Sequence, residues 1–220
     1  MTDISMIEQY EGSIDLDCAP PNLQELWLDN NRLSGTISLK RLPIELKIVS
    51  LSGNSFSGCI CLENLPATLE ILCLDNNAFT GNVCLTALPD TLCELYLSNN
   101  KLSGILDLTS LPEDLAGLYL NENSFSGTLC LTQLPEKLSS VNIAENQLSG
   151  CPDMTSLPPN LMKLYLYENR LNGSMDFSRL PKTLEVLDVR ANAALAGNIT
   201  DKNWFMLGRF DGTQVKFTGK

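Results

Sequence analysis

The apolar residues of this chain fall in short alternating groups that return at a regular interval. In the segment 92–112, Leu95 and Leu97 flank one outward position, and Leu106 and Leu108 flank another. Alternation with a period of two is typical of a strand that buries one face. Each segment therefore predicts two short strands, and too few residues remain between them for a helix of about 10 residues.

Proline, glycine and asparagine mark the same interval along the chain. Each recurs at a spacing of 23 residues, and one extra residue is inserted at Ala193–Ala194. The asparagines are Asn31, Asn54, Asn77, Asn100, Asn123, Asn146, Asn169 and Asn192. A constant spacing of this size indicates a repeat architecture. We expect an N-terminal cap with a partial repeat at residues 1–22, eight repeats at 23–199 and a C-terminal cap at 200–220.

The repeat reads L-x-x-L-x-L-x-x-N-x-L, and copies such as Ser34–Ile37 continue it with Ser-Gly-x-Ile. This motif resembles the leucine-rich repeat, and the Ser-Gly-x-Ile continuation resembles its plant-receptor subtype. The Leu-Pro ending of each unit is similar to that of some protist and bacterial effector arrays. The resemblance implies a mainly β, right-handed solenoid with a parallel concave sheet and short second strands on another side. It implies few or no regular α-helices outside the terminal caps.

Two columns of the repeat are expected inside the solenoid. The inward asparagines can donate and accept hydrogen bonds where the chain leaves the first strand, so losing one should cost about 1–3 kcal/mol. Phenylalanine replaces leucine at four inward positions, and we expect all four rings in the core. They are Phe56, Phe79, Phe125 and Phe177.

The last twenty residues are expected to cover the apolar end of the repeat stack. Asp201 predicts the start of a short helix that runs through Phe210, and Gln214–Phe217 predicts a final strand. The helix would pack three apolar residues against the last repeat, namely Trp204, Phe205 and Leu207. A second binding site around Trp204 is the alternative interpretation.

Charge and composition exclude several functions. The chain has no histidine, which removes the usual nucleophile systems, imidazole metal sites and proton shuttles. A net charge of −11 disfavours nucleic acid and anionic membrane surfaces as partners. No carboxylate pair stands out as an acid–base site. We therefore expect no enzymatic activity, no catalytic residues, no bound metal and no cofactor.

The eight cysteines follow repeat columns and lack the flanking clusters that secreted leucine-rich-repeat ectodomains usually carry. Exposed unpaired thiols suit a reducing compartment, and Asp3 and Glu8 interrupt the pattern of a secretory signal. We therefore predict a cytoplasmic protein, with a cell-surface or secreted protein as the alternative. Cys61 and Cys84 lie in adjacent repeats at a separation that would allow a disulfide, which stays open.

The outward positions of the first strand are the candidate binding surface, because tyrosine and tryptophan gather there. At the centre of this strand stand Trp27, Tyr96, Tyr119, Asn142 and Tyr165. Tyr167 follows two residues after Tyr165, and Glu122, Glu145 and Glu168 stand at the next outward position. Lys163 and Arg190 lie at the same end. Strand propensity alone could also place tyrosines here.

A tyrosine-rich surface with an acidic rim suits a protein or peptide partner that carries Lys or Arg. The sequence thus predicts a non-catalytic scaffold that binds such a partner on its concave face. A cell-surface or secreted recognition or adhesion domain is the alternative. We expect a monomer without direct membrane insertion, since polar residues or proline interrupt every apolar run well before about 20 residues.

Overall fold

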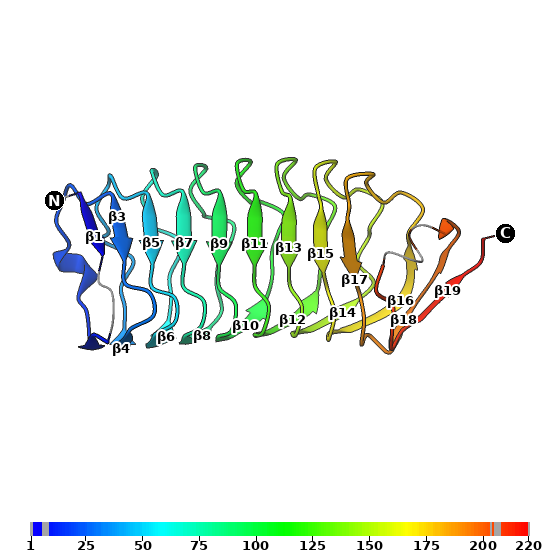
Figure 1. The fold of residues 1–220 in the computed structure, drawn as a ribbon, viewed down its shortest axis with the longest axis horizontal. Coiled ribbons are helices and arrows are strands. Elements are labelled where there is room, and N and C mark those ends of the chain that lie inside the picture. The colour runs from blue at the N-terminus through cyan, green and yellow to red at the C-terminus, as the bar shows by residue number, and fades with distance from the viewer. Residues whose placement is uncertain (1, 6–8, 203, 205–207, 220) are drawn as a thin grey trace.

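The computed structural model describes residues 2–5, 9–202, 204 and 208–219. The described chain forms two parallel sheets that run side by side along the whole length of a solenoid (Figure 1). Each repeat contributes one strand to each sheet, and every strand pairs with the corresponding strands of the repeats before and after it. The predicted mainly β solenoid with stacked parallel strands is confirmed.

The nine-stranded sheet contains the strand predicted around each Leu-x-Leu pair, and it is the sheet expected on the concave side. Its strands are β1 (Asp3–Ser5), β3 (Glu25–Trp27), β5 (Ile48–Ser50), β7 (Ile71–Cys73), β9 (Glu94–Tyr96), β11 (Gly117–Tyr119), β13 (Ser140–Asn142), β15 (Lys163–Tyr165) and β17 (Val186–Asp188). Only three residues of each repeat belong to this sheet, so the remaining chain is available to turn and form the second one.

The ten-stranded sheet contains the second strand of each repeat. Its strands are β2 (Glu11–Gly12), β4 (Arg32–Thr36), β6 (Ser55–Cys59), β8 (Ala78–Gly81), β10 (Lys101–Ile105), β12 (Ser124–Thr128), β14 (Gln147–Gly150), β16 (Arg170–Asp176), β18 (Ala194–Ile199) and β19 (Gln214–Phe217). Most of these strands begin directly after the asparagine of their repeat. The second strand therefore lies earlier in the repeat than the prediction around Leu106 and Leu108.

The core fills the space between the two sheets. Leu95, Leu97 and Leu108 are buried, as are their counterparts in the other repeats. Phe56, Phe79 and Phe125 are fully buried, and Phe177 is nearly so, which confirms their predicted place. The rings of Phe56 and Phe79 stack with centroids 6.3 Å apart. One continuous apolar core therefore supports both sheets.

The asparagine column binds the chain where it leaves the first strand, as predicted, and it also joins each repeat to its neighbour. The Asn54 side-chain amide donates to the Leu51 carbonyl oxygen at 3.1 Å and to the Leu28 carbonyl oxygen of the preceding repeat at 2.8 Å. Its Oδ1 accepts from the Leu33 amide, also in the preceding repeat, at 3.0 Å. The same pattern recurs at the other asparagines, so backbone groups at a tight turn are satisfied.

The two ends of the solenoid are built differently. At the N-terminal end, β1 pairs with β3, and a 3₁₀ turn, η1 (Leu16–Cys18), buries Leu16. At the C-terminal end, the predicted final strand is present as β19 and pairs with β18. Among the described residues, no helix is long and apolar enough to cross a membrane.

The helix predicted to run through Phe210 is wrong in its extent. Lys202 and Trp204 are helical, but Arg209 forms a parallel bridge with Asp188 in the nine-stranded sheet. The Arg209 amide donates to the Leu187 carbonyl oxygen at 2.9 Å, a bond that a continuing helix could not make. Phe205 and Leu207, expected to pack on the last repeat, lie outside the described residues.

Candidate partner-binding face

The outward residues at the centre of each first strand form one continuous line, which we call the central row. Strand pairing places them directly beside one another in the order Trp27, Ser50, Cys73, Tyr96, Tyr119, Asn142, Tyr165 and Asp188. Neighbouring strands of a sheet lie about 4.8 Å apart. Tyr96 and Tyr165 are therefore about 14 Å apart along the row, three strand spacings.

Tyr96 and Tyr119 form an aromatic platform in the middle of the row. Their rings stack with centroids 4.6 Å apart and an interplanar angle of 5°. Burial and the neighbouring Glu94 charge raise the pKa of Tyr96 above its usual range. The hydroxyl therefore stays protonated and can donate a hydrogen bond at physiological pH.

Glu94 lies beside this platform, and Gly117 makes the room for it. A Cβ atom added to Gly117 would lie 1.9 Å from Glu94 Oε2 and 2.9 Å from Tyr119 Cε2. Glu94 Oε2 is buried without a hydrogen bond. Burial raises the pKa of Glu94, and the Tyr96 hydroxyl opposes that rise. The platform thus carries a poorly solvated carboxylate. The sequence analysis did not predict Glu94 as a site residue, because it considered the central row and Glu94 lies two residues before Tyr96.

A second group gathers around Tyr167, two residues after the central row. The Tyr167 hydroxyl donates to Glu145 Oε1 at 3.3 Å, and the Arg190 guanidinium lies 5.4 Å from the centre of the Tyr167 ring. Arg190 also binds the buried Asp188 through its NH2 group at 2.8 Å. Arg190 is therefore a partly exposed cation that is already paired with a buried carboxylate, so less of its charge is available to a partner than its sequence position suggested.

Glu122, Glu145 and Glu168 follow one another in the left-handed backbone region, with φ of 56°, 53° and 51°. Of the other five repeats, three place asparagine and one places glycine at this position, residues that tolerate this conformation better, and the last places Ala191 there with a φ of 55°. A residue with a Cβ pays about 1–2 kcal/mol there. The three predicted rim glutamates thus form an acidic edge that carries a backbone cost.

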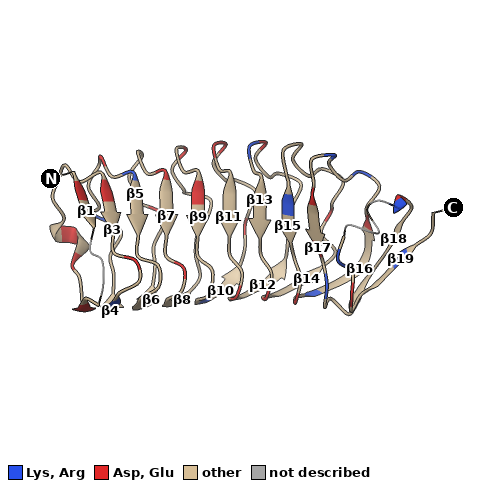
Figure 2. Ribbon diagram, in the orientation of Figure 1, with Lys and Arg blue, Asp and Glu red and all other residues tan. Residues whose placement is uncertain are grey.

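Trp27 lies apart from the other predicted residues. Ser50 and Cys73 separate it from Tyr96 in the central row. Asn142 fills the space between Tyr119 and Tyr165, and its Oδ1 accepts from the Ala144 amide at 3.2 Å. Lys163 is exposed at the start of β15 (Figure 2). The structure therefore brings together all the predicted residues from Tyr96 to Arg190, but not Trp27.

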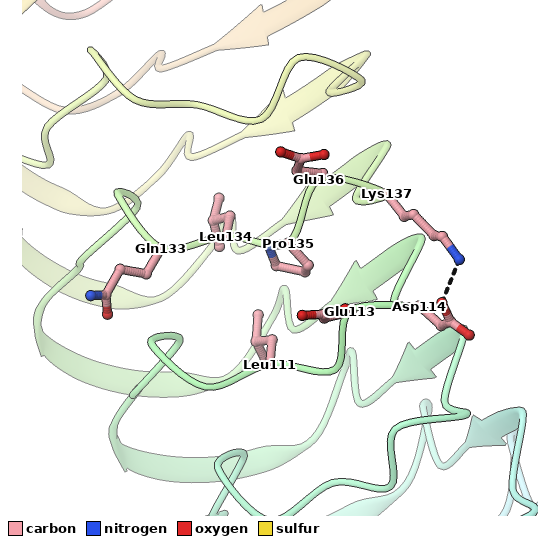
Figure 3. Close-up of a pocket in the computed structure, with 8 residues that line it drawn as sticks. All are labelled: Leu111, Glu113, Asp114, Gln133, Leu134, Pro135, Glu136 and Lys137. Atoms are coloured by element: carbon pink, nitrogen blue, oxygen red, sulfur yellow. Dashed lines mark hydrogen bonds and ion pairs between the residues drawn. The ribbon is translucent and has the colours of Figure 1, made fainter.

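Hollows between the Leu-Pro turns of neighbouring repeats do not form a dedicated site. The hollow in Figure 3 has a volume of about 540 Å³ and lies between the Leu-Pro turns of two repeats, with Lys137 bound to Asp114 at its edge. A hollow of about 520 Å³ lies one repeat earlier, around Leu111 and Pro112. Because the same groove recurs in two neighbouring repeats, we interpret it as a product of the stacking.

Charged residues of both signs lie on the strands of the nine-stranded sheet. Figure 2 shows acidic residues on β3 and β9 and a basic residue on β15, which correspond to Glu25, Glu94 and Lys163.

Within the described part of the chain, no cluster of three or more cysteine, aspartate or glutamate side chains could hold a metal ion. All eight cysteines carry free thiols, including Cys61 and Cys84.

Comparisons with known proteins agree with the repeat architecture. The family model described as Leucine Rich Repeat matches residues 22–40 and 91–118. No curated protein is significantly similar to the sequence. The Arabidopsis receptor kinase HAESA leucine-rich-repeat ectodomain, solved with an N-terminally extended IDA peptide hormone ligand, is 27% identical with a TM-score of 0.68. The match covers 96% of this chain and 42% of that one.

Two further solved structures share the fold at lower identity. The plant peptide hormone receptor RGFR1, in complex with RGF2, is 23% identical with a TM-score of 0.69, and the match covers 96% of this chain and 39% of that chain. A plant ice-binding protein is 24% identical with a TM-score of 0.68, over 97% of this chain and 80% of that chain. The chain thus spans about two-fifths of the length of the receptors that it matches.

The predicted cytoplasmic location is wrong. The similarity to the HAESA receptor ectodomain points to a protein at the cell surface or in the secreted state. The prediction inferred a reducing compartment from exposed thiols. Cys59, Cys130 and Cys151 are exposed because they lie at outward positions in the second half of the repeat. Their exposure follows from where a repeat column points and gives no information about the redox state of a compartment.

Proposed function

We propose that this leucine-rich-repeat protein of plant-receptor-like type binds a protein or peptide partner through the outer face of its nine-stranded sheet, at the cell surface or as a secreted protein. A protein or peptide interaction module is what the solenoid and its likeness to a peptide-bound receptor ectodomain support. We also propose that the protein binds without catalysing a reaction. The fold itself serves many functions, so this proposal rests on the surface of the nine-stranded sheet.

The observation that carries the proposal is the aromatic platform and its surroundings. Tyr96 and Tyr119 stack on a rigid sheet, so they lose little side-chain freedom when a partner covers them. Tyr165 lies two strands further along the same row. Partly buried aromatic rings with hydroxyl donors are the residues that most often dominate binding energy at protein interfaces.

The acidic edge of Glu122, Glu145 and Glu168 supports a partner that carries Lys or Arg. Among the described residues, none of these three carboxylates forms an ion pair with a lysine or arginine. Unpaired charges on the rim of an interface mainly accelerate association with an oppositely charged partner. The backbone cost of keeping glutamate at positive φ is consistent with a use other than folding.

The test uses a partner obtained by affinity capture and then measured as a purified component. Tyr119→Ala and Tyr165→Ala are each expected to weaken its binding at least tenfold, as for interface anchors of about 1.4 kcal/mol or more. Tyr10→Ala is the matched control, because Tyr10 is an exposed tyrosine outside the nine-stranded sheet. Thermal unfolding of each variant separates lost binding from lost stability, since Tyr119→Ala also removes the stacking on Tyr96.

The charge of the edge is tested separately. Glu145→Lys is expected to slow association at low salt and to lose this effect at high salt, whereas Glu136→Lys, in a Leu-Pro turn outside the nine-stranded sheet, should leave the rate unchanged. If the double variant of Tyr119 and Tyr165 binds the partner as tightly as the unmodified protein, the tyrosines are ordinary strand residues and the proposal fails.

A further inference from the structure

A hollow of about 660 Å³ opens on the same face near the N-terminal end, and its lining residue Cys73 pairs with Tyr96 on the next strand. It is lined by outward residues of three consecutive repeats, namely Trp27, Asp29, Asn30, Ser50, Ser52, Gly53, Cys73, Asp75 and Asn76. Trp27 stands on one side and Asp75 and Asn76 stand on the other. We call this hollow the Trp27 pocket.

The Trp27 pocket exists because the middle repeat has small side chains at three outward positions. Ser50, Ser52 and Gly53 occupy the places held by Trp27, Asp29 and Asn30 in the repeat before. Gly53 has a φ of 65°, and a Cβ atom there would lie 2.7 Å from Asn30 Oδ1. The sequence of a single repeat therefore creates the depression, and its neighbours supply the walls.

The walls of the pocket are fixed in place by hydrogen bonds. The Trp27 indole Nε1 donates to Glu25 Oε2 at 2.9 Å, which holds the ring. The Asn30 side-chain amide donates to Asp29 Oδ2 at 2.9 Å, and the Ser52 hydroxyl donates to Asp75 Oδ1. These contacts restrict the rotamers of the aromatic ring and of both carboxylates before any ligand arrives, which lowers the entropy lost on binding.

The pocket is negatively charged. Two carboxylates, Asp29 and Asp75, line it with no lysine or arginine among the lining residues. Neither forms an ion pair within the described part of the chain. Cys73 in the lining is affected by the same charges, because burial first, and then Asp75 and Asp29, raise the pKa of its thiol to about 12. Anionic ligands are disfavoured in such a site, and cations are favoured.

We infer that the Trp27 pocket takes a single arginine side chain from the bound partner, an inference that rests on the proposed function. A guanidinium is planar, stacks on an indole face and offers several N–H donors to two carboxylates at once. The Asp29 and Asp75 carboxylates receive those donors while the Trp27 ring receives the flat face. The pocket then binds one part of the partner, and Tyr96, Tyr119 and Tyr165 bind another part of it.

The experiment titrates the full chain with short blocked peptides and follows nuclear magnetic resonance signals. The probes are Ac-Gly-Arg-Gly-NH₂, its lysine analogue, and its citrulline analogue, which replaces the guanidinium with a neutral group of similar shape. The signals followed are the Trp27 indole N–H, told apart from that of Trp204 with a Trp204→Phe variant, and the Gly53 amide. The arginine peptide should saturate these signals with a Kd on the order of 10 mM or tighter.

The comparisons among peptides and variants decide the inference. Citrulline should bind at least tenfold more weakly than arginine, and lysine at least threefold more weakly. The double variant Asp29→Asn/Asp75→Asn should weaken arginine binding at least tenfold, whereas Asp90→Asn, an exposed aspartate outside the pocket, should not. Equal binding of arginine and citrulline, no effect of the aspartate pair, or no approach to saturation would overturn the pocket. Equal binding of lysine would overturn the assignment to arginine.

Failure of this inference can be told apart from failure of the proposed function. If the tyrosine variants abolish partner binding but the arginine peptide does not bind, only the pocket is wrong. If the arginine peptide saturates the Trp27 pocket while the tyrosine variants bind the partner normally, the pocket stands and the tyrosine surface is wrong.

Discussion

Individual side chains of the same type occupy different environments in this fold. Cys73 lies in the central row, where burial raises the pKa of its thiol to about 12. Cys130 is exposed on the other half of the repeat, where hydrogen bonds from Thr132 lower the pKa of its thiol. Since the thiolate is the reactive form, the two cysteines should differ in reactivity by much more than their shared residue type suggests.

We predict that iodoacetamide alkylates Cys130 of the native protein at least tenfold faster than Cys73 at pH 8. As the pH rises from about 7 to 10, the Cys130 rate should level off first, because a lowered pKa is passed early. The Cys73 rate should still be rising at pH 10, since its thiol remains mostly protonated below about 12. Peptide mapping by mass spectrometry measures both rates.

Unfolded protein provides the control for this reactivity difference. In denaturant the environments are lost, so both thiols should react at similar rates. Equal rates in the native protein would contradict the burial and hydrogen bonding seen around the two sulfur atoms.

The sequence could predict the position of such residues but not their contacts. The repeat placed Tyr96, Tyr119 and Tyr165 in one outward row, and strand pairing agrees. The burial of Asp188 beneath Arg190 depends on rotamers and on Arg209 of the following segment. The Glu94 carboxylate reaches over a glycine 23 residues later. Contacts of this kind connect neighbouring repeats, and no local pattern encodes them.

Among the elements, the turn that follows each first strand has a clear energetic role. Asn146 is buried, and its side-chain amide donates to the Ala144 and Leu120 carbonyl oxygens at 3.0 and 3.1 Å. Its Oδ1 accepts from the Phe125 amide at 2.9 Å. One side chain therefore closes its own turn and attaches it to the turn before.

We predict that Asn146→Ala lowers the free energy of unfolding by about 1–3 kcal/mol, because the buried Phe125 amide loses its acceptor and the Leu120 carbonyl keeps only the hydrogen bond from Asn123. Urea denaturation of the variant measures the change. Asn160→Ala is the control: Asn160 is exposed and donates a single hydrogen bond, so its loss should cost less than about 0.5 kcal/mol. A cost at Asn146 no larger than that at Asn160 would show that water replaces the buried hydrogen bonds.

Repetition explains why two strands per repeat were predicted correctly, although the second was placed too late in the repeat, and why the extent of the C-terminal helix was not. Eight copies of the same alternation average out local ambiguity, and both strands appear in repeat after repeat. The segment after Thr200 occurs once, so only capping and apolar spacing were available there. Arg209 lies outside any helix because it pairs with β17, a long-range contact that local spacing cannot reveal.

At the scale of the whole molecule, each repeat contacts only its neighbours, so the two ends are the places where apolar surface could be uncovered. Near the C-terminal end, the Phe177 and Phe210 rings meet edge to face with centroids 5.9 Å apart. Pairing of β19 with β18 also closes one edge of the ten-stranded sheet. We propose that residues 200–220 protect this end of the stack.

Truncation after Thr200 is predicted to cause end-to-end association or aggregation and to lower the melting temperature. It would expose the β18 edge and the ring of Phe177 to solvent. Light scattering after size-exclusion chromatography and a thermal melt measure these changes. Truncation after Phe217 keeps β19 and should behave like the full chain. A monomeric protein that ends at Thr200 and melts at the original temperature would refute the capping role.

The compartment could not be read from the sequence for a reason that also lies at this scale. Net charge, thiols and the absence of histidine describe the composition of the surface, and similar compositions occur inside and outside cells. Likeness to receptor ectodomains depends instead on the path of the whole chain, which becomes comparable only once the solenoid is built. The fold class was within reach of the sequence, but the location was not.

The strand pairing that gives each repeat one place in the central row also fixes the distances between residues of that row. Strands of the sheet are about 4.8 Å apart, so outward side chains of different repeats can be separated only by whole multiples of that step. Inserting one 23-residue unit after Asp90 would move Trp27 and Tyr96 one step further apart and keep the three repeats that line the Trp27 pocket next to one another. The distance between two anchoring points on a ligand could thus be matched by counting repeats, without redesign of either anchor.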